Sequence, residues 1–351
     1  MLGDAKMERK ICKRSIAGIG ILLCLTGICG CQKGTAAEAS QDIFAMDTYM
    51  TVTAYGSGAQ EAVDKASQEI ERLDALLSTG NKDSEIYAVN HNGGGKLSQD
   101  SASLVERSME LYQKTDGAFD IAIYPVMCEW GFADDDYKVP AQAALTELLK
   151  LTDASQISYD KEKSEVTFNI EGMQIDLGGI AKGYTSNRIM DIYRECGLKS
   201  GLVNLGGNVQ AYGYKPDGSK WRVAIEDPDD TSDYFGVLSI ADKAVITSGG
   251  YERFFEEDGK TYHHIIDPKT GYPADSGLLS VTIVSADGTL ADGLSTSFFI
   301  MGKEKACQYY REDPDAFDMI LMTEDRKVYV TEGIKEDFST DLAVTVIERE
   351  K

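Results

Sequence analysis

The stretch Ile175–Ile189, IDLGGIAKGYTSNRI, combines an acidic residue, a glycine pair and a lysine at the start of an expected helix. We predict that Asp176 ends a strand, that Gly178 and Gly179 make a tight turn, and that the helix begins directly after them. Backbone N–H groups at a helix start favour an anion, and Lys182 would add a positive charge there. The usual nucleotide loop needs four residues between its first glycine and Gly-Lys-Ser/Thr, and this stretch lacks them. Taken alone, it is either an anion-binding helix start or a plain strand-to-helix turn with an exposed lysine.

The segments on either side mix helices and strands without a regular strand–helix–strand rhythm. Apolar residues at three-to-four spacing predict amphipathic helices that include Val63–Leu77 and Ser101–Lys114. β-branched and aromatic residues predict one strand over Asp42–Ala54, and Gly288–Met301 is predicted to be the final, buried helix. Short strands account for most of the second half of the chain. The pattern favours an α+β fold, with mixed sheets and flanking helices in one compact catalytic unit over residues 42–345.

The composition narrows the choice of partners. The chain has 351 residues, enough for a sizeable core, and a formal net charge of −23. This charge argues against nucleic acid as a partner, because affinity for a phosphate backbone depends on cationic side chains. We interpret the acidity as a solvated surface that keeps the protein soluble.

The N-terminus has the layout of a secretory signal peptide. A basic start precedes an apolar run, Ile16–Ile28, that is too short for a comfortable membrane span. The run leads into ICGC, which resembles a bacterial lipobox, so we predict a signal peptide over residues 1–30 and a lipidated Cys31 as the mature N-terminus. A plain cleavable signal and an uncleaved anchor are the alternatives. Residues 31–41 are expected to form a flexible tether to the outer face of the cytoplasmic membrane.

The cysteines do not suggest a disulfide framework. Four of the seven lie in the leader, and Cys128, Cys196 and Cys307 are far apart in the rest of the chain. An odd number at this spacing predicts neither a disulfide network nor a clustered metal site. We expect buried free thiols.

The segment LADGLSTSFF contains a candidate metal site. Asp292 and Thr296 are four residues apart, so on a helix they share one face, and Ser295 adds a further oxygen nearby. Carboxylate and hydroxyl oxygens are ligands that Mg²⁺ accepts, with water and substrate phosphate in its other positions. The competing interpretation is helix capping, because Asp and Ser favour helix starts.

The segment TYHHIIDPKTGYP contains two of the three histidines of the chain. On a strand, His264 and Ile266 would share one face and His263 the other. Histidine is the natural general base near neutral pH, and a hydrogen-bonded strand histidine is the alternative. The following DPKTG has the composition of a turn, so Asp267 is expected to be structural.

The segment TDGAFD places Ala118, Phe119 and Asp120 together. A small residue, an aromatic ring and an acid in a turn can stack on a planar ligand and accept a hydrogen bond from it. An aromatic anchor for a loop is the alternative.

These fragments, in this order, resemble the ApbE family of FAD:protein FMN transferases, which are exported flavin-trafficking enzymes. The resemblance runs from about Phe44 to Met301. It rests on MDTYMTV, LSTGNKDSEI, TDGAFDIAIYPV with WGF, IDLGGIAKGY, GLVNLGGN, ITSGGYERFF, HHIIDPKTGYP and SVTIVSADGTLADGLSTSFFIMG. No single segment is decisive, but all of them occur in the order and at the spacing found in the family, which makes the resemblance specific.

The resemblance implies a role for each matching residue. The positions expected to contact FAD are Met46, Ala118, Phe119, Asp120, Asp176, Lys182 and Ile266. The family's Mg²⁺, for which Mn²⁺ is a possible substitute, is implied to bind the main-chain carbonyl of Gly179 with the side chains of Asp292 and Thr296.

This chain departs from the family pattern at three positions. Asp47 replaces a glycine, Gly80 replaces a tyrosine found in many members, and Ser295 replaces a second aspartate. The missing tyrosine removes a stacking partner for the cofactor, and the missing aspartate removes one carboxylate from the metal site.

The activity that the resemblance implies is magnesium-dependent transfer of FMN from FAD to a Ser or Thr of an extracytoplasmic acceptor protein, with release of AMP. We hypothesise that His264 accepts the proton of the attacking hydroxyl. Two other functions fit the same residues: a magnesium-dependent pyrophosphatase that cleaves FAD to FMN and AMP, and a lipoprotein that binds FAD without turnover.

Overall fold

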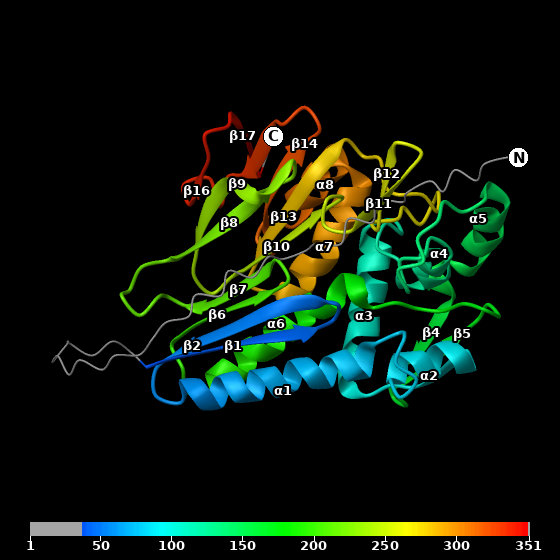
Figure 1. Ribbon diagram of the computed structural model, residues 1–351, viewed down its shortest axis with the longest axis horizontal. Coiled ribbons are helices and arrows are strands. Elements are labelled where there is room, and N and C mark those ends of the chain that lie inside the picture. Colours follow the sequence, from blue (N-terminus) through cyan, green and yellow to red (C-terminus); the bar gives the residue numbers. More distant parts are fainter. Residues whose placement is uncertain (1–36, 350–351) are drawn as a thin grey trace, which may run out of the picture.

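The computed structural model describes residues 37–349 (Figure 1). The predicted signal peptide, the lipidation site Cys31 and the first part of the tether lie outside this range. The helices are α1 Ala59–Leu77, α2 Glu85–Asn92, α3 Gln99–Lys114, α4 Tyr124–Glu129, α5 Gln142–Leu148, α6 Gly178–Glu195, α7 Gly288–Met301 and α8 Lys303–Glu312.

The strands of the first half are β1 Glu38–Ala45, β2 Thr48–Tyr55, β3 Gly94–Lys96, β4 Ile157–Asp160, β5 Glu165–Phe168, β6 Ser200–Leu205 and β7 Asn208–Gly213. Those of the second half are β8 Trp221–Asp227, β9 Asp230–Ile240, β10 Ala244–Gly249, β11 Phe254–Glu257, β12 Lys260–His263, β13 Leu278–Ser285, β14 Asp318–Thr323, β15 Val328–Thr331, β16 Phe338–Ser339 and β17 Val344–Ile347.

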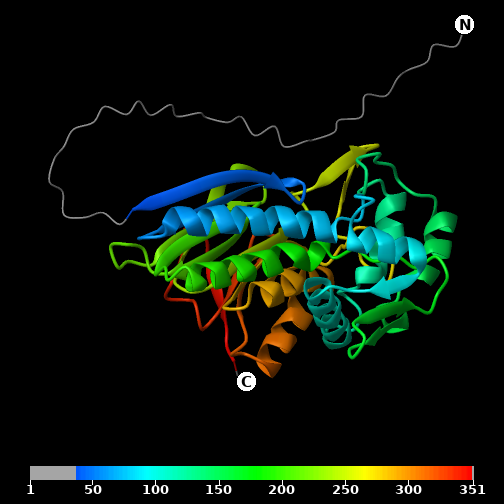
Figure 2. The same cartoon turned by 90° about the horizontal axis from the view of Figure 1, so that it is seen from below.

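A nine-stranded sheet organises the molecule. Its strand order is β1-β2-β6-β7-β10-β13-β14-β15-β17, and only the β15–β17 pair is parallel. Helices α1, α6 and α7 pack on one face of this sheet, as Figure 2 shows. A three-stranded sheet of order β16-β9-β8 packs on part of the other face through a shared apolar cluster around Trp221. The expected α+β class with mixed sheets and flanking helices is confirmed.

A second apolar cluster, around Trp130, joins α4 and α5 to the β11–β12 hairpin. The Trp130 indole N–H donates to the carbonyl of Gly271 at 2.7 Å, and its ring lies against Phe255, Tyr262 and Tyr272. Aromatic packing of this kind buries a large area with defined geometry. It fixes the segment after β12 relative to the rest of the molecule.

The single strand expected over Asp42–Ala54 is wrong, because the chain forms the β1–β2 hairpin there. Ala45 pairs with Thr48, and the two residues between them, Met46 and Asp47, have φ values of 47° and 58°. Two-residue hairpin turns with positive φ at both positions match the twist of the strands, and apolar continuity hid this turn in the sequence. The expected boundary at residue 42 also falls inside β1, which begins at Glu38. Residues 38–41 are therefore strand rather than tether.

Further expectations need correction. The thiols of Cys128, Cys196 and Cys307 are free as expected but not buried, since Cys128 is exposed and the other two are partly exposed. Asp176 does not end a strand, since residues 173–177 belong to no strand or helix and α6 begins at Gly178. The helix α7 has the predicted bounds, but it is not the final helix, because α8 follows it. The expected domain end at residue 345 lies within β17. Among residues 37–349, no helix has the length and apolar character needed to cross a membrane.

Candidate functional site

The site is built where α6 and α7 approach each other closely. A Cβ atom on Gly183 of α6 would lie 2.1 Å from the carbonyl oxygen of Gly288 and 2.6 Å from the Cβ of Asp292. Both distances are shorter than real Cβ contacts, so only glycine permits this crossing. The backbone N–H of Gly183 donates to Oδ2 of Asp292 at 2.8 Å. The helix crossing therefore also orients the carboxylate.

The Asp292 carboxylate is buried and held on both oxygens. The side-chain amide of Asn208, at the start of β7, donates to its Oδ1 at 3.0 Å. Burial raises the pKa of Asp292, and the donors and the nearby Lys182 charge oppose this rise. Each carboxylate oxygen has a second lone pair, so both remain able to bind a cation.

Hydroxyl oxygens gather beside this carboxylate. The position of Cβ on Gly179 would lie 4.0 Å from Oγ1 of Thr296, so this glycine and the threonine are adjacent. The hydroxyl of Ser248 lies 3.4 Å from that of Thr296 and 2.8 Å from that of Ser295. Ser295 also donates to the Asp292 carbonyl at 2.8 Å. The atoms that could bind a metal here are all oxygens, which suits Mg²⁺ or Mn²⁺. The residues present therefore fit the cation implied by the resemblance.

Asp176 and Lys182 lie on either side of Gly178 and Gly179, which are the first residues of α6 and do not form the separate tight turn that was expected. Oδ1 of Asp176 accepts the N–H of Gly178 at 2.7 Å, and limited solvation raises the pKa of the Asp176 carboxyl. Lys182 is partly buried and forms no ion pair with any residue in the described range. Its charge nevertheless acts on Asp176, Asp292 and the His264 ring. A lysine that forms no ion pair of its own is suited to hold an anionic ligand.

His264 is neutral in this structure. Burial lowers its pKa to about 3, and Arg253 and Lys182 add to the effect. The Nδ1 atom lies 3.1 Å from the carbonyl oxygen of Arg253, so Nδ1 carries the proton and donates to that oxygen. The Nε2 lone pair has no hydrogen-bond partner among residues 37–349. A neutral imidazole with a free Nε2 can accept a proton, although more weakly than an unperturbed histidine.

Met46 reaches the site from the β1–β2 turn. Its N–H donates to Asp74 at 3.0 Å, and its sulfur lies 3.9 Å from the hydroxyl of Thr185 on α6. The charge of the adjacent Asp47 raises the pKa of Asp176. Asp tolerates positive φ better than most residues, which explains how the departure from glycine is accommodated.

The expected flavin contacts are less open than the sequence suggested. The Phe119 ring packs over Gly179, 3.2 Å from where a Cβ would lie, beside the buried Ala118. The two oxygens of Asp120 accept backbone N–H groups of residues 122 and 154, at 2.8 and 3.3 Å. Burial raises the pKa of Asp120 to about 6. Asp120 therefore caps a short 3₁₀ turn, Ile121–Ile123, in this structure.

Ile266 is also buried. It forms an isolated bridge with Pro273 and lies in the apolar cluster around Trp130. The turn after it is structural as expected, because Asp267 accepts the N–H of Lys269 at 2.9 Å.

Three contributors escaped the sequence analysis: Gly183, Asn208 and Ser248. They lie in segments on which the family resemblance rests, IAKGY, LGGN and ITSGG. Their position in these motifs was the sequence feature that could have indicated a role in the site. Within residues 37–349, no group of three or more His, Cys, Asp or Glu side chains converges. A metal at this site would therefore depend on hydroxyl and main-chain oxygens besides the Asp292 carboxylate.

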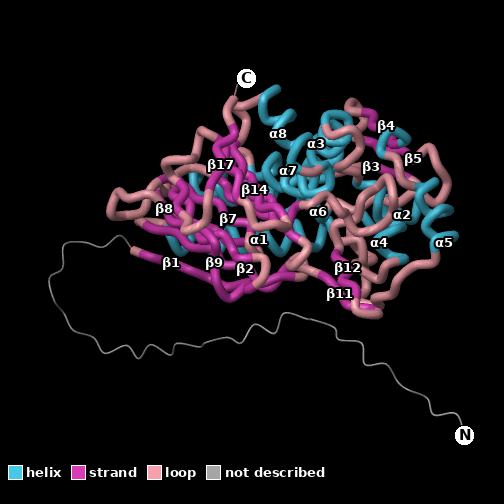
Figure 3. Tube along the Cα trace, turned by 90° about the horizontal axis from the view of Figure 1, so that it is seen from above, coloured by secondary structure: helices cyan, strands magenta, loops and turns pink. Residues whose placement is uncertain are grey.

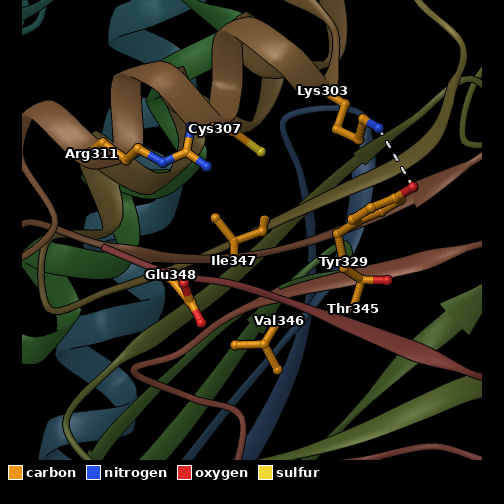
Figure 4. Close-up of a pocket in the computed structure, with 8 residues that line it drawn as sticks. All are labelled: Lys303, Cys307, Arg311, Tyr329, Thr345, Val346, Ile347 and Glu348. Atoms are coloured by element: carbon orange, nitrogen blue, oxygen red, sulfur yellow. Dashed lines mark hydrogen bonds between the residues drawn. The ribbon is translucent and has the colours of Figure 1, made fainter. Parts of the chain in front are cut away.

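A surface cavity of about 290 Å³ lies elsewhere. It is bordered by α8, β15 and β17, with Lys303, Cys307 and Arg311 on one side and Tyr329 on the other (Figure 4). None of the expected site residues lines it, so its size does not bear on the chemistry above.

Comparison with known proteins identifies the family of this chain and supports its fold. A family model described as the ApbE family matches residues 46–321. The chain is 34% identical over 355 residues to a protein named FAD:protein FMN transferase from Treponema pallidum (strain Nichols), covering 94% of this chain and 98% of that one. The crystal structure of the ApbE protein from Thermotoga maritima is similar with a TM-score of 0.81 and 29% identity, over 86% of this chain and 99% of that one. The flavin transferase ApbE from Vibrio cholerae is similar with a TM-score of 0.77 and 25% identity, over 86% and 100%.

Proposed function

This chain belongs to the ApbE family, and from that premise we propose that it transfers FMN from FAD to a Ser or Thr hydroxyl of another protein. The observation that carries the proposal is the α6–α7 crossing. It brings the Asp292 carboxylate and the Thr296 hydroxyl beside Gly179 and close to Lys182, whose charge acts on Asp292 and which forms no ion pair among the described residues. This is an arrangement for a cation and a pyrophosphate, the two things that phosphoryl transfer from FAD requires.

In the proposed reaction, the acceptor oxygen attacks the phosphorus on the FMN side of the pyrophosphate. A new P–O bond joins FMN to the protein, the bridging P–O bond breaks, and AMP leaves. Lys182 holds the pyrophosphate, and Nε2 of His264 accepts the proton of the attacking hydroxyl. The two negative charges of the substrate favour the protonated ring and so offset the low pKa of His264 in the free protein. Asp292, Thr296 and the Gly179 carbonyl would hold Mg²⁺ or Mn²⁺, which supplies charge neutralisation at the pyrophosphate.

The same proposal includes the location of the enzyme. We expect export, removal of residues 1–30 and lipidation of Cys31, so that the catalytic unit faces outward from the membrane and meets extracytoplasmic acceptors. Mass spectrometry of the membrane-extracted protein would detect the diacylated cysteine as the mature N-terminus. A soluble mature chain that starts elsewhere would refute this part alone.

The test of the activity is incubation with FAD and Mg²⁺, with and without a recombinant exported redox protein as candidate acceptor. Mass spectrometry of the acceptor should show one added FMN on a Ser or Thr, and AMP should appear in equal amount. Free FMN released at the same rate with and without acceptor would instead establish a pyrophosphatase. FAD bound without AMP release would establish a carrier. The Asp292→Ala variant is the matched negative control for both activities.

A further inference from the structure

The β1–β2 hairpin carries an exposed aromatic pair at the border of the site. Phe44 and Tyr49 are cross-strand partners, each 62% exposed, and their rings meet edge-on with centroids 5.0 Å apart. Their neighbours Ile43, Ala45 and Met50 are buried on the opposite face, against α1. The pair is therefore not part of the core. Single exposed apolar side chains are common, but two aromatic rings in contact form a patch of the kind found in interfaces.

The hairpin tip connects this pair to the candidate site. Only the turn of Met46 and Asp47 separates the two strands. The Met46 sulfur contacts the hydroxyl of Thr185, which is about one helical turn after Lys182 in α6. Figures 1 and 2 both show the tip over the first turns of α6. A protein segment that runs along the hairpin to its tip would thus reach Met46, which contacts α6 one turn from Lys182.

The outer side of β1 offers backbone pairing. β1 is the first strand of the nine-stranded sheet and has no strand neighbour on that side within residues 37–349, as Figure 3 shows. Free sheet edges accept an extended peptide as an added strand, with side-chain pockets supplying specificity. The other free edge, β17, carries Val344 and Val346, which are 41% exposed, but it borders the cavity of Figure 4 and not the candidate site.

The charge of the hairpin indicates the chemistry of its partner. Residues 38–55 contain Glu38, Asp42 and Asp47 and no Lys or Arg. Such a strand attracts a basic segment and repels an acidic one, which sets orientation and association rate more than affinity.

We propose that the β1–β2 hairpin is the docking surface for the acceptor protein, which adds an extended, basic segment along β1 and packs an apolar side chain against Phe44 and Tyr49. The inference rests on the proposed transferase function and names how that same site receives its second substrate.

The test compares the double variant Phe44→Ser/Tyr49→Ser with two controls of similar exposure, Tyr234→Ser on β9 and Val346→Ser on β17. The acceptor used is the protein that the wild-type enzyme converts to an FMN adduct. We expect the double variant to raise the KM for this acceptor by about tenfold or more, in the range of interface hot spots. Its FAD affinity, its kcat at saturating acceptor and its melting temperature should match the wild type, and both controls should behave as wild type.

A charge variant gives a second, independent readout. Asp42→Lys should raise the KM for the acceptor and weaken its dependence on salt, because a screened attraction is lost. An unchanged KM in both the double and the charge variant would overturn the inference. So would a loss of FAD affinity in the double variant, which would make the hairpin part of the flavin site, or a change in its oligomeric state, which would make the patch a contact between copies of this chain. Failure of the wild type to modify any acceptor would refute the proposed function itself.

Discussion

Replacing Gly183 with Ala tests whether the close α6–α7 crossing serves catalysis. The added methyl would lie 2.1 Å from the Gly288 carbonyl oxygen, where an ordinary contact is 3.4 Å or more, so the helices must separate by roughly 1 Å. The same methyl would lie 2.6 Å from Cβ of Asp292 and would push that side chain directly. The hydrogen bond from the Gly183 N–H to the carboxylate would lengthen with the same movement.

Two stability effects of this substitution oppose each other. Overpacking a well-packed contact costs about 1–3 kcal/mol. Ala is better than Gly inside a helix by about 1 kcal/mol, which offsets part of that cost. The net loss of stability should therefore be at most about 2 kcal/mol, and the variant should fold. A misplacement of about 1 Å at a catalytic group can cost about 100-fold in rate. We thus expect a folded protein with about 1% of wild-type activity.

The matched control is Gly293→Ala in α7. Its new methyl would meet Cδ1 of Leu111 at 2.3 Å, which is the far end of a flexible side chain rather than backbone. It receives the same gain in helix propensity, and Leu111 can move aside. FMN transfer and thermal melting would be measured for both variants over a range of Mg²⁺ concentrations. Wild-type activity in Gly183→Ala, or equal losses of activity in the two variants, would refute the reasoning.

Lys182→Met should raise the KM for FAD by about tenfold, and an unchanged KM would contradict the role of this lysine. The melting temperature should change little, because Lys182 has no ion pair among the described residues to lose. The kcat/KM for FAD should stay flat between about pH 7 and 8, because His264 is neutral in the free enzyme with a pKa of about 3 and Asp120, with a pKa of about 6, is ionised there; a decline from pH 8 to pH 7 would argue against this. Between pH 6.5 and 3 the unfolded chain binds more protons at His264 than the folded one. The ring's contribution to stability is therefore full above pH 6.5 and lost as the pH falls towards 3, and His264→Gln should flatten that part of the melting-temperature profile. Partial burial, and to a smaller extent the Asp176 charge, raise the pKa of the Cys128 thiol, which is still exposed. Alkylation of Cys128 should slow when FAD is saturating, and equal labelling with and without FAD would place the ligand elsewhere.

Part of the site was readable from the sequence because it depends on local spacing. Asp292 and Thr296 share a face of α7 since four residues make about one helical turn, and α7 has the predicted bounds. The glycine pair and Lys182 lie at the start of α6 for a similar reason, although the helix begins two residues earlier than expected. Residues that are close together in one helix keep their relative positions whatever the tertiary packing around the helix.

The β1–β2 hairpin shows where local reading failed. A run of apolar and β-branched residues on both sides of Met46 reads as one strand, and the turn lacks the glycine or asparagine that normally announces it. What holds Met46 at a positive φ is its contact with Asp74 and Thr185, which come from α1 and α6. That constraint is tertiary.

The sequence by itself determined the fold class, the helix that carries Asp292 and Thr296, and the family. The tertiary structure decided how those groups are held and what state they are in. Gly183 and Asn208 are separated from Asp292 by 109 and 84 residues, so their hydrogen bonds to its carboxylate follow from helix and sheet packing and from no local pattern. The pKa of His264 likewise falls to about 3 because distant segments bury the ring. Periodicity is a property of a segment, whereas burial and close approach belong to the packed whole.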